Sequence, residues 1–173
     1  MNKDKLEFLK KQTEEDATYI ESIVSSIVSD CCDKLDKYVK YVSDIIADNS
    51  YEVTDAELDD IVMTLPTLLY YVGDAQEHIG IRSDIAETAF KTQFNDFYME
   101  ADGSGPIRKA YAENKLADEI LISIVYNKAY DVIKQKVTIA IELLQSAKKI
   151  MTRRMQSFEM ERSSPNKDRS EFQ

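Results

Sequence analysis

The chain has 173 residues, with 22 Lys or Arg against 32 Asp or Glu, so its formal net charge at pH 7 is −10. That length accommodates one ordinary domain, or one domain and an arm. The excess of acids, taken alone, argues against a nucleic-acid partner. Only 4 Gly and 3 Pro are present, Trp is absent, and no stretch alternates apolar and polar residues. These features argue against a β-sheet protein and predict an all-α fold of several antiparallel helices with one long C-terminal helix.

The N-terminus and the cysteines carry no signal for a membrane or an oxidising compartment. Residues 1–16 are highly charged and lack the apolar core of a signal peptide. The longest uncharged run, 61–73, is shorter than the roughly 20 residues that span a bilayer, and Pro66 divides it. Cys31 and Cys32 are adjacent and cannot join distant parts of the fold, so we interpret them as small apolar residues of a helix. We expect a cytoplasmic protein that makes no membrane contact.

Residues 1–50 are predicted to form an N-terminal helical segment. Apolar side chains recur there at steps of three and four residues, the spacing of one helix face, as in Ile20, Ile23, Val24, Ile27 and Val28. A break in this pattern at 13–16 is expected to divide a short first helix from a longer second one. Turn-forming residues at 48–50 end the run.

Residues 51–160 are predicted to form a helical body that includes the long C-terminal helix. Thr54 and Glu57 have the spacing of a capping box, in which each side chain satisfies a free amide at the start of a helix. We expect this helix to be kinked or stopped at Pro66, because proline lacks the amide proton and its ring clashes with the preceding turn. Gly73 is available as its C-cap.

A further helix is expected over 74–98, with a restart near Ser83 after Gly80. Its apolar face carries Ile81, Ile85, Ala89, Phe90, Phe94, Phe97 and Tyr98. The segment 99–107 holds two of the 4 glycines and one of the 3 prolines, which makes it the clearest loop of the chain.

The chain is predicted to return to helix at Arg108, with a weak point near Asn114, and to continue into one long helix over 116–160. No Gly or Pro interrupts that stretch, and at about 1.5 Å per residue the helix would be on the order of 65 Å long. The polar residues 161–173 are interpreted as a disordered tail.

The long helix carries an apolar stripe at alternating steps of four and three residues, the pattern of a helix that faces partner helices. After Met151 the stripe slips to Met155 and Phe158, as in a stutter. Such a stripe is too long for one small domain to bury, so it should pack along other long helices or along copies of itself. The predicted oligomerisation residues are Tyr126, Tyr130, Ile133, Val137, Ala140, Leu144, Ala147, Met151 and Met155.

Catalytic constellations are missing from the sequence. His78 is the only histidine, and the Gly-containing loop lacks the Gly-Lys-Ser/Thr ending of a phosphate-binding loop. Acidic runs such as 14–16 lack the alternate ligand positions of a calcium loop and are better interpreted as solvated helix faces. We therefore expect no enzyme activity, no metal site and no cofactor.

Basic residues are concentrated near the C-terminus. Residues 127–169 hold ten Lys or Arg and five Asp or Glu, a net charge of +5, so the rest of the chain carries −15. Basic side chains next to aromatic ones, here including Phe158, are typical of single-stranded nucleic-acid binding, because cations hold phosphates while exposed rings stack bases. The predicted DNA-binding residues are Lys91, Tyr98, Arg108, Lys109, Lys134, Lys136, Lys148, Lys149, Arg153 and Arg154. The alternative from spacing alone is that the rings belong to the core and the cations to a solvated face.

The stretch 89–98, the loop that follows it and the long C-terminal helix resemble the UvsY-like recombination mediators of tailed phages. In that family a helix ends in a Leu-Lys-Ala-Arg-x-x-Tyr-Tyr-like motif ahead of a Gly/Asp-rich loop. Ala89-Phe90-Lys91-Thr92-Gln93 and Asp96-Phe97-Tyr98 occupy that motif here, with Gln93 near the position of the family's arginine. The likeness covers about residues 65–160.

The resemblance implies a ring-forming homo-oligomer that binds single-stranded DNA and helps to load a RecA-like recombinase onto strands coated by a single-strand binding protein. Lys91 and Tyr98 would contact DNA, the C-terminal helix would build the ring, and the protein would act in the host cytoplasm if phage-encoded. The alternative is a structural or adaptor protein, such as a virion or scaffold component, whose helices bind only protein.

Overall fold

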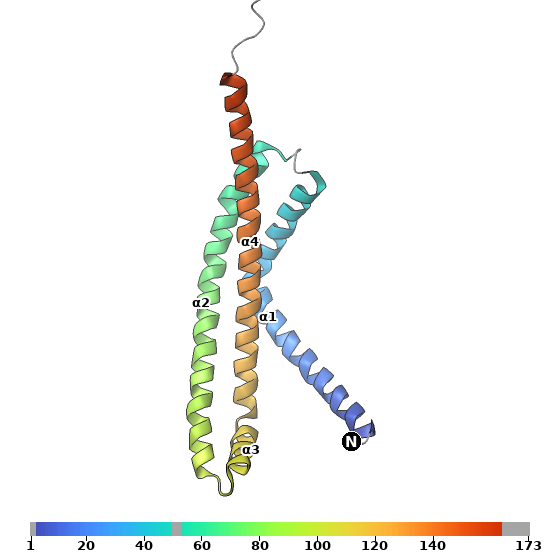
Figure 1. Ribbon diagram of the computed structural model, residues 1–173, viewed down its shortest axis with the longest axis vertical. Helices are drawn as coiled ribbons and strands as arrows, with labels where there is room; N and C mark the ends of the chain where they lie inside the picture. Colours follow the sequence, from blue (N-terminus) through green and yellow to red (C-terminus); the bar gives the residue numbers. More distant parts are fainter. Residues whose placement is uncertain (1–2, 50–52, 164–173) are drawn as a thin grey trace, which may run out of the picture. The chain divides into compact units, whose positions relative to one another are not determined.

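The structure is a computed structural model that describes residues 3–49 and 53–163. These residues form four helices, α1 (Lys3–Asn49), α2 (Asp55–Glu100), α3 (Gly105–Lys115) and α4 (Ala117–Ser163), shown in Figure 1. The described ranges contain no β-strand. The predicted all-α class is therefore confirmed.

Helix α1 is continuous, so the predicted division at 13–16 is wrong. No Gly or Pro occurs in this helix to interrupt its hydrogen bonding. The hydroxyl of Thr18 donates to the carbonyl oxygen of Glu14 at 2.8 Å, a bond that a helix accommodates. A polar stretch within a helix was thus mistaken for a boundary.

The capping box at the start of α2 is confirmed. The amide of Thr54 donates to Oε2 of Glu57 at 2.7 Å, and the amide of Glu57 donates to Oγ1 of Thr54 at 3.2 Å. The hydroxyl of Thr54 also donates to Oε2 of Glu57, at 2.8 Å. The bond from the Thr54 amide, and next the one from its hydroxyl, hold the pKa of Glu57 below its ordinary value. The two side chains therefore fix where α2 begins.

The predicted ends of α2 at Pro66 and Gly73 and the predicted restart at Ser83 are wrong, while a kink at Pro66 stays a prediction. The helix passes through Pro66 and Gly73 without ending, and no new helix starts at Ser83. Ile61 and Leu65, both with no exposed surface, precede the proline. Burying two such side chains stabilises the helix by about 3–6 kcal/mol, which outweighs the cost of about 3 kcal/mol for an internal proline.

The predicted loop is confirmed, but it is shorter than expected. Helix α2 reaches Glu100 and α3 begins at Gly105, with Pro106 in its first turn, where the missing amide proton costs little. Gly103 between them has a φ of 116°, which only glycine adopts without strain. A short break at Leu116 separates α3 from α4, close to the weak point predicted at Asn114.

Helix α4 extends to Ser163, three residues into the segment predicted as a tail. The remaining residues of that predicted tail, 164–173, lie outside the described part of the chain.

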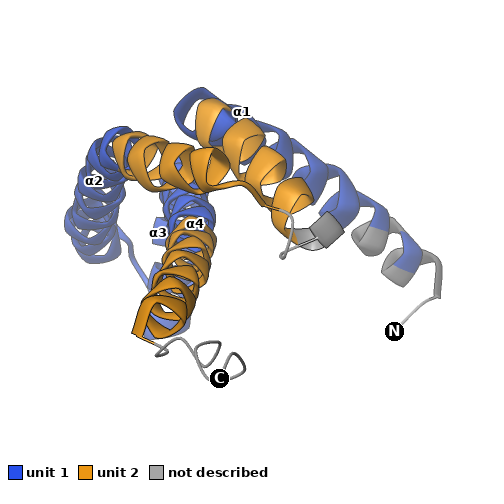
Figure 2. Ribbon diagram, turned by 90° about the horizontal axis from the view of Figure 1, so that it is seen from above, with its two compact units in different colours: residues 1–33, 70–137 blue, residues 34–69, 138–173 orange. Residues whose placement is uncertain are grey.

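The chain divides into two compact units, coloured separately in Figure 2. Unit 1 comprises residues 1–33 and 70–137, and unit 2 comprises residues 34–69 and 138–173. Helices α1, α2 and α4 each contribute to both units.

Within unit 1, α2 and α4 pack antiparallel. The hydroxyl of Ser83 donates to Oδ1 of Asn127 at 2.7 Å, and Gly80 faces the ring of Tyr130. Between these two contacts the residue number rises on α2 and falls on α4, so the two helices run antiparallel, as predicted. The buried side chains of the unit are Val28, Cys32, Val72, Ile79, Ser83, Ala101, Ala112, Leu116, Val125, Ala129 and Ile133.

The core face of α2 in unit 1 differs from the predicted one. Ile79 and Ser83 are buried, whereas Ile81 and Ile85 are 49% and 63% exposed. The prediction followed the apolar side chains, but a hydrogen-bonded serine takes the inward position. Phe90, Phe94 and the later aromatic residues of the predicted face are half-buried.

Unit 2 has its own core, in which α1, α2 and α4 meet. Buried side chains from all three helices and from the residue before the capping box form one cluster: Val42, Val53, Leu58, Ile61 and Ala147. At its edge the hydroxyl of Tyr38 donates to Oδ2 of Asp60 at 2.7 Å and joins α1 to α2. Burial, and next this hydrogen bond, raise the pKa of Tyr38 to about 12.

Candidate nucleic-acid interface

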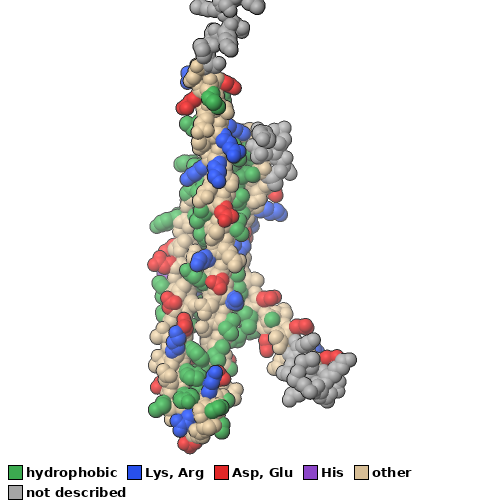
Figure 3. All heavy atoms as spheres, viewed as in Figure 1, with side chains coloured by type: hydrophobic (Ala, Val, Ile, Leu, Met, Phe, Trp, Pro, Cys, Tyr) green, Lys and Arg blue, Asp and Glu red, His purple; other side chains and the backbone are tan. Residues whose placement is uncertain are grey.

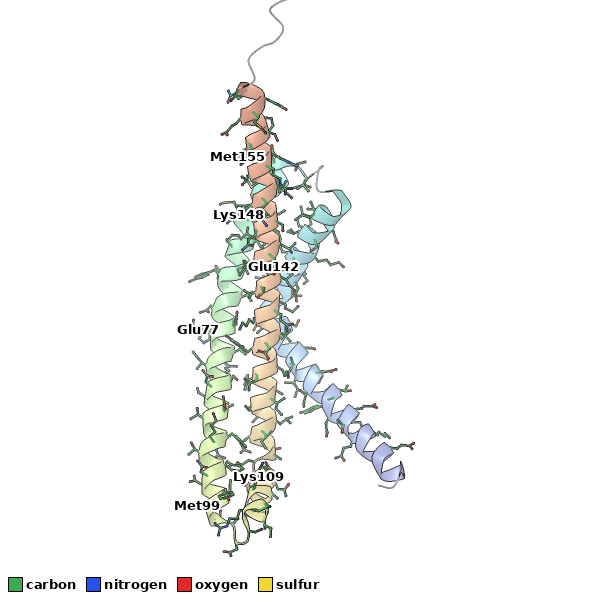
Figure 4. The ribbon with its side chains drawn as sticks, in the orientation of Figure 1. Glu77, Met99, Lys109, Glu142, Lys148 and Met155 are labelled. Carbon is green, nitrogen blue, oxygen red and sulfur yellow. The ribbon has the colours of Figure 1, made fainter. Side chains whose placement is uncertain are left out.

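Three exposed cations follow one another on the part of α4 that belongs to unit 2: Lys148, Lys149 and Arg153, hereafter the α4 basic patch. Among the described residues, none of these side chains has an ion pair or a hydrogen-bond partner. The stretch 143–158 around them contains no acidic residue. Figure 3 shows basic side chains along this part of α4, and Figure 4 labels Lys148 there. The patch is an unneutralised positive surface.

Arg154 was predicted to bind DNA with its neighbours, but it points elsewhere. Its Nη1 lies 2.6 Å from Oδ1 of Asp55, and its Nη2 donates to the carbonyl oxygen of Val53. The side chain is only 27% exposed. Arg154 thus ties α4 to the start of α2 within unit 2.

A groove of about 520 Å³ lies beside the α4 basic patch in unit 2. It is lined by Asp55, Ile150, Arg153, Ser157, Phe158 and Glu161, together with the Arg154 side chain. Phe158 is 61% exposed, and every residue from Met155 to Ser163 is exposed. An open groove therefore lies beside the C-terminal part of α4, and its wall contains a cation and an aromatic ring.

The predicted DNA-binding residues around the α2–α3 loop lie in unit 1, and their side chains have partners there. Lys91 Nζ is 2.5 Å from Oε1 of Glu87, and Lys109 Nζ is 3.5 Å from Oε1 of Glu113. The Nε of Arg108 donates to the carbonyl oxygen of Gly103 at 3.1 Å. Figure 4 labels Lys109 on α3. Each of these two lysines thus has a carboxylate partner four residues away on its own helix.

Tyr98 belongs to an aromatic row on α2. Its ring stacks on Phe94 with centroids 6.1 Å apart, and Phe94 contacts Phe90 at 5.7 Å. Tyr98 is half-buried, and a Cβ on Gly105 would lie 3.5 Å from its hydroxyl oxygen. The Tyr98 side chain therefore has ring contacts within α2, and its hydroxyl lies next to the start of α3.

The region around the α2–α3 loop and the region of the α4 basic patch differ in net charge. Residues 87–119 carry four basic and seven acidic side chains, a net charge of −3, whereas 143–158 carry four basic ones and no acid. Because a polyanion is attracted by unneutralised positive charge, the α4 basic patch is the stronger candidate for phosphate contacts. DNA binding by the residues around the loop stays a prediction. The same holds for Lys134 and Lys136, each of which takes part in an interaction within the chain.

The predicted oligomerisation stripe is largely engaged within the single chain. Ile133, Ala140 and Ala147 have no exposed surface, and Met151 packs against the core of unit 2. The half-buried members are Tyr126, Tyr130, Val137 and Leu144. Met155, labelled in Figure 4, is 63% exposed. The stripe was expected to pack along other long helices or along copies of itself. Packing on the other helices of the same chain accounts for these contacts, and an oligomer stays a prediction.

Sequence reasoning missed two features of this region. The pairing of Arg154 with Asp55 joins residues 99 positions apart and leaves no local pattern to detect. The groove at Phe158 depends on where α2 begins relative to α4 in unit 2, which residue spacing does not encode. The exposed ring itself was recognisable, because Phe158 follows the slip in the stripe.

No group of three or more His, Cys, Asp or Glu side chains within the described ranges is placed to hold a metal ion. None of the described helices combines the length and the apolar character needed to cross a membrane. No family model matches the chain, and no match was found among curated proteins or solved structures.

Proposed function

We propose that the protein is a non-enzymatic mediator that binds single-stranded DNA through the α4 basic patch. One observation carries the proposal: Lys148, Lys149 and Arg153 are exposed, have no side-chain partner among the described residues, and lie in a stretch without acidic residues. Three cations on neighbouring turns of one helix neutralise successive phosphates and release their counterions, which favours binding to any sequence.

The biological role we propose follows from the family resemblance described above. As a mediator, the protein would help to load a RecA-like recombinase onto DNA coated by a single-strand binding protein, and would act as a homo-oligomer. The remainder of the chain is acidic, with −15 against +5 in residues 127–169. Such an acidic body repels DNA away from the patch and attracts basic surfaces of protein partners.

A structural or adaptor protein that binds only other proteins is the second candidate. It is favoured by the large apolar side chains that α2 exposes in unit 1: Tyr70, Tyr71, Ile81, Ile85 and Met99. Exposed apolar side chains at helical spacing are typical of surfaces that pack on another protein.

Fluorescence anisotropy with labelled single-stranded and double-stranded oligonucleotides at low salt tests the proposal. The informative variant replaces Lys148, Lys149 and Arg153 by Glu. A matched control replaces three exposed lysines outside the patch, Lys34, Lys40 and Lys128, by Glu and changes the net charge equally.

The wild type and the control should bind single-stranded DNA, and the patch variant should not. Because all six positions are exposed, circular dichroism should show all three proteins equally helical. An equal loss of DNA binding in the patch variant and in the control would mean that binding depends only on the net charge of the protein. An absence of binding by the wild type would favour the adaptor.

A further inference from the structure

We infer that the groove at the end of α4 is a binding site for one unpaired nucleobase, which stacks on the ring of Phe158. The inference rests on the proposed function and specifies how the same surface would distinguish single-stranded from double-stranded DNA.

The groove and the α4 basic patch share Arg153. This residue lines the groove and belongs to the patch, and Lys149 precedes it by one helical turn, about 6 Å along the axis. A phosphate held by these two cations would leave its base next to the groove.

Phe158 offers the stacking surface. Phe158 is 61% exposed, so much of its apolar surface lies in water, and a base stacked on its ring would bury part of that surface. Ile150, on the same face of α4, adds an apolar contact, and Ser157 is held to the helix by its bond to the carbonyl oxygen of Arg153 at 3.1 Å. A flat aromatic ligand suits such a wall, and every base has a face that stacks on a ring.

The acids of the groove orient the nucleotide. Asp55 is neutralised by Arg154 at 2.6 Å, so it does not repel a phosphate strongly. Glu161 is exposed and has no described partner, and it repels phosphates from its end of the groove. The backbone would therefore stay on the Arg153 side while the base enters. A base inside a duplex is stacked on its neighbours and cannot enter, so the site would select single strands.

The absence of Trp from the chain allows a direct test by fluorescence. Phe158→Trp introduces one tryptophan in the groove, and Met160→Trp introduces one on another face of the same helix end, where Met160 is 68% exposed. A single-stranded oligonucleotide should quench the tryptophan at 158 strongly and that at 160 little. In anisotropy titrations, Phe158→Leu should weaken binding on the order of tenfold, whereas Met160→Leu should leave it unchanged.

Equal quenching at both positions, with unchanged affinity for Phe158→Leu, would overturn the base site. If the variant with Lys148, Lys149 and Arg153 replaced still lost DNA binding in that case, the proposed phosphate contacts would be supported. The groove would then be a candidate site for a protein partner instead of a base. If the wild type bound no single-stranded DNA, the proposed function and the base site would both fail.

Discussion

Arg153 and Arg154 show how adjacent residues of one type acquire different roles. On a helix, neighbours point about 100° apart, so one can face solvent while the next faces another helix. Arg153 is exposed and its side chain has no partner in the part of the chain that the structure describes, whereas Arg154 contacts Asp55 and Val53. Composition identified both as basic, but only the packing of α4 on α2 in unit 2 separates the arginine that joins the two helices from the one that we propose binds DNA.

This difference predicts opposite outcomes for two alanine variants. Arg154→Ala removes charged hydrogen bonds and should lower the free energy of unfolding by about 1–2 kcal/mol. Arg153→Ala should change it by less than about 0.5 kcal/mol but weaken the binding of single-stranded DNA. Urea unfolding and anisotropy on both variants check this, and equal stabilities would contradict the role given to Arg154.

Tyr38 predicts a pH dependence of stability. Its pKa is raised from the ordinary 10.0 to about 12, so the folded state favours the protonated phenol. The bond to Asp60 should therefore contribute fully below about pH 10 and be lost as the pH rises from 10 towards 12. Tyr38→Phe should reduce stability by about 1 kcal/mol below pH 10, and its difference from the wild type should shrink above that pH. A difference that stays constant up to pH 12 would contradict this assignment.

At the scale of elements, the sequence predicted the helical class, the capping box at Thr54 and the loop near Gly103. These features depend on local chemistry, namely amides that need partners and a backbone angle that needs glycine. The continuity of α2 through Pro66 could not be predicted, because it depends on burial of Ile61 and Leu65 against distant residues. Likewise, the burial of Ser83 is explained only by its hydrogen bond to Asn127, which lies 44 positions later in the chain.

The glycines within α2 give a prediction for this helix. A Cβ at Gly73 would meet nothing within 4 Å, whereas one at Gly80 would lie 3.2 Å from Cε2 of Tyr130. Gly73→Ala should therefore stabilise the protein by about 0.5–1 kcal/mol through helix propensity. Gly80→Ala should gain less, because the Tyr130 ring must shift. Thermal or urea unfolding compares the two, and an equal or greater gain at Gly80 would contradict the close packing of α2 and α4 in unit 1.

At the scale of the whole molecule, charge is distributed unevenly along an all-α chain. The acidic remainder and the basic C-terminal region were evident from composition, but the cations differ in availability. Lys91 and Lys109 near the α2–α3 loop have carboxylate partners, whereas the cations of the α4 basic patch have none within the described ranges. The ion pairs at the loop join residues four apart on one helix and were recognisable from spacing. The pairing of Arg154 with Asp55 and the burial of the α4 stripe depend on contacts between helices, so the sequence alone could not rank the cations of α4.

The salt dependence of single-stranded DNA binding tests the central claim most directly. If Lys148, Lys149 and Arg153 each neutralise a phosphate, the logarithm of the binding constant should fall with the logarithm of the salt concentration with a slope of about −2 per protomer. Replacing Lys149 by Gln should reduce that slope by about 0.7 and leave the helix intact. A slope near zero, or one that the Lys149 variant does not change, would contradict the account and remove the α4 basic patch from the binding site.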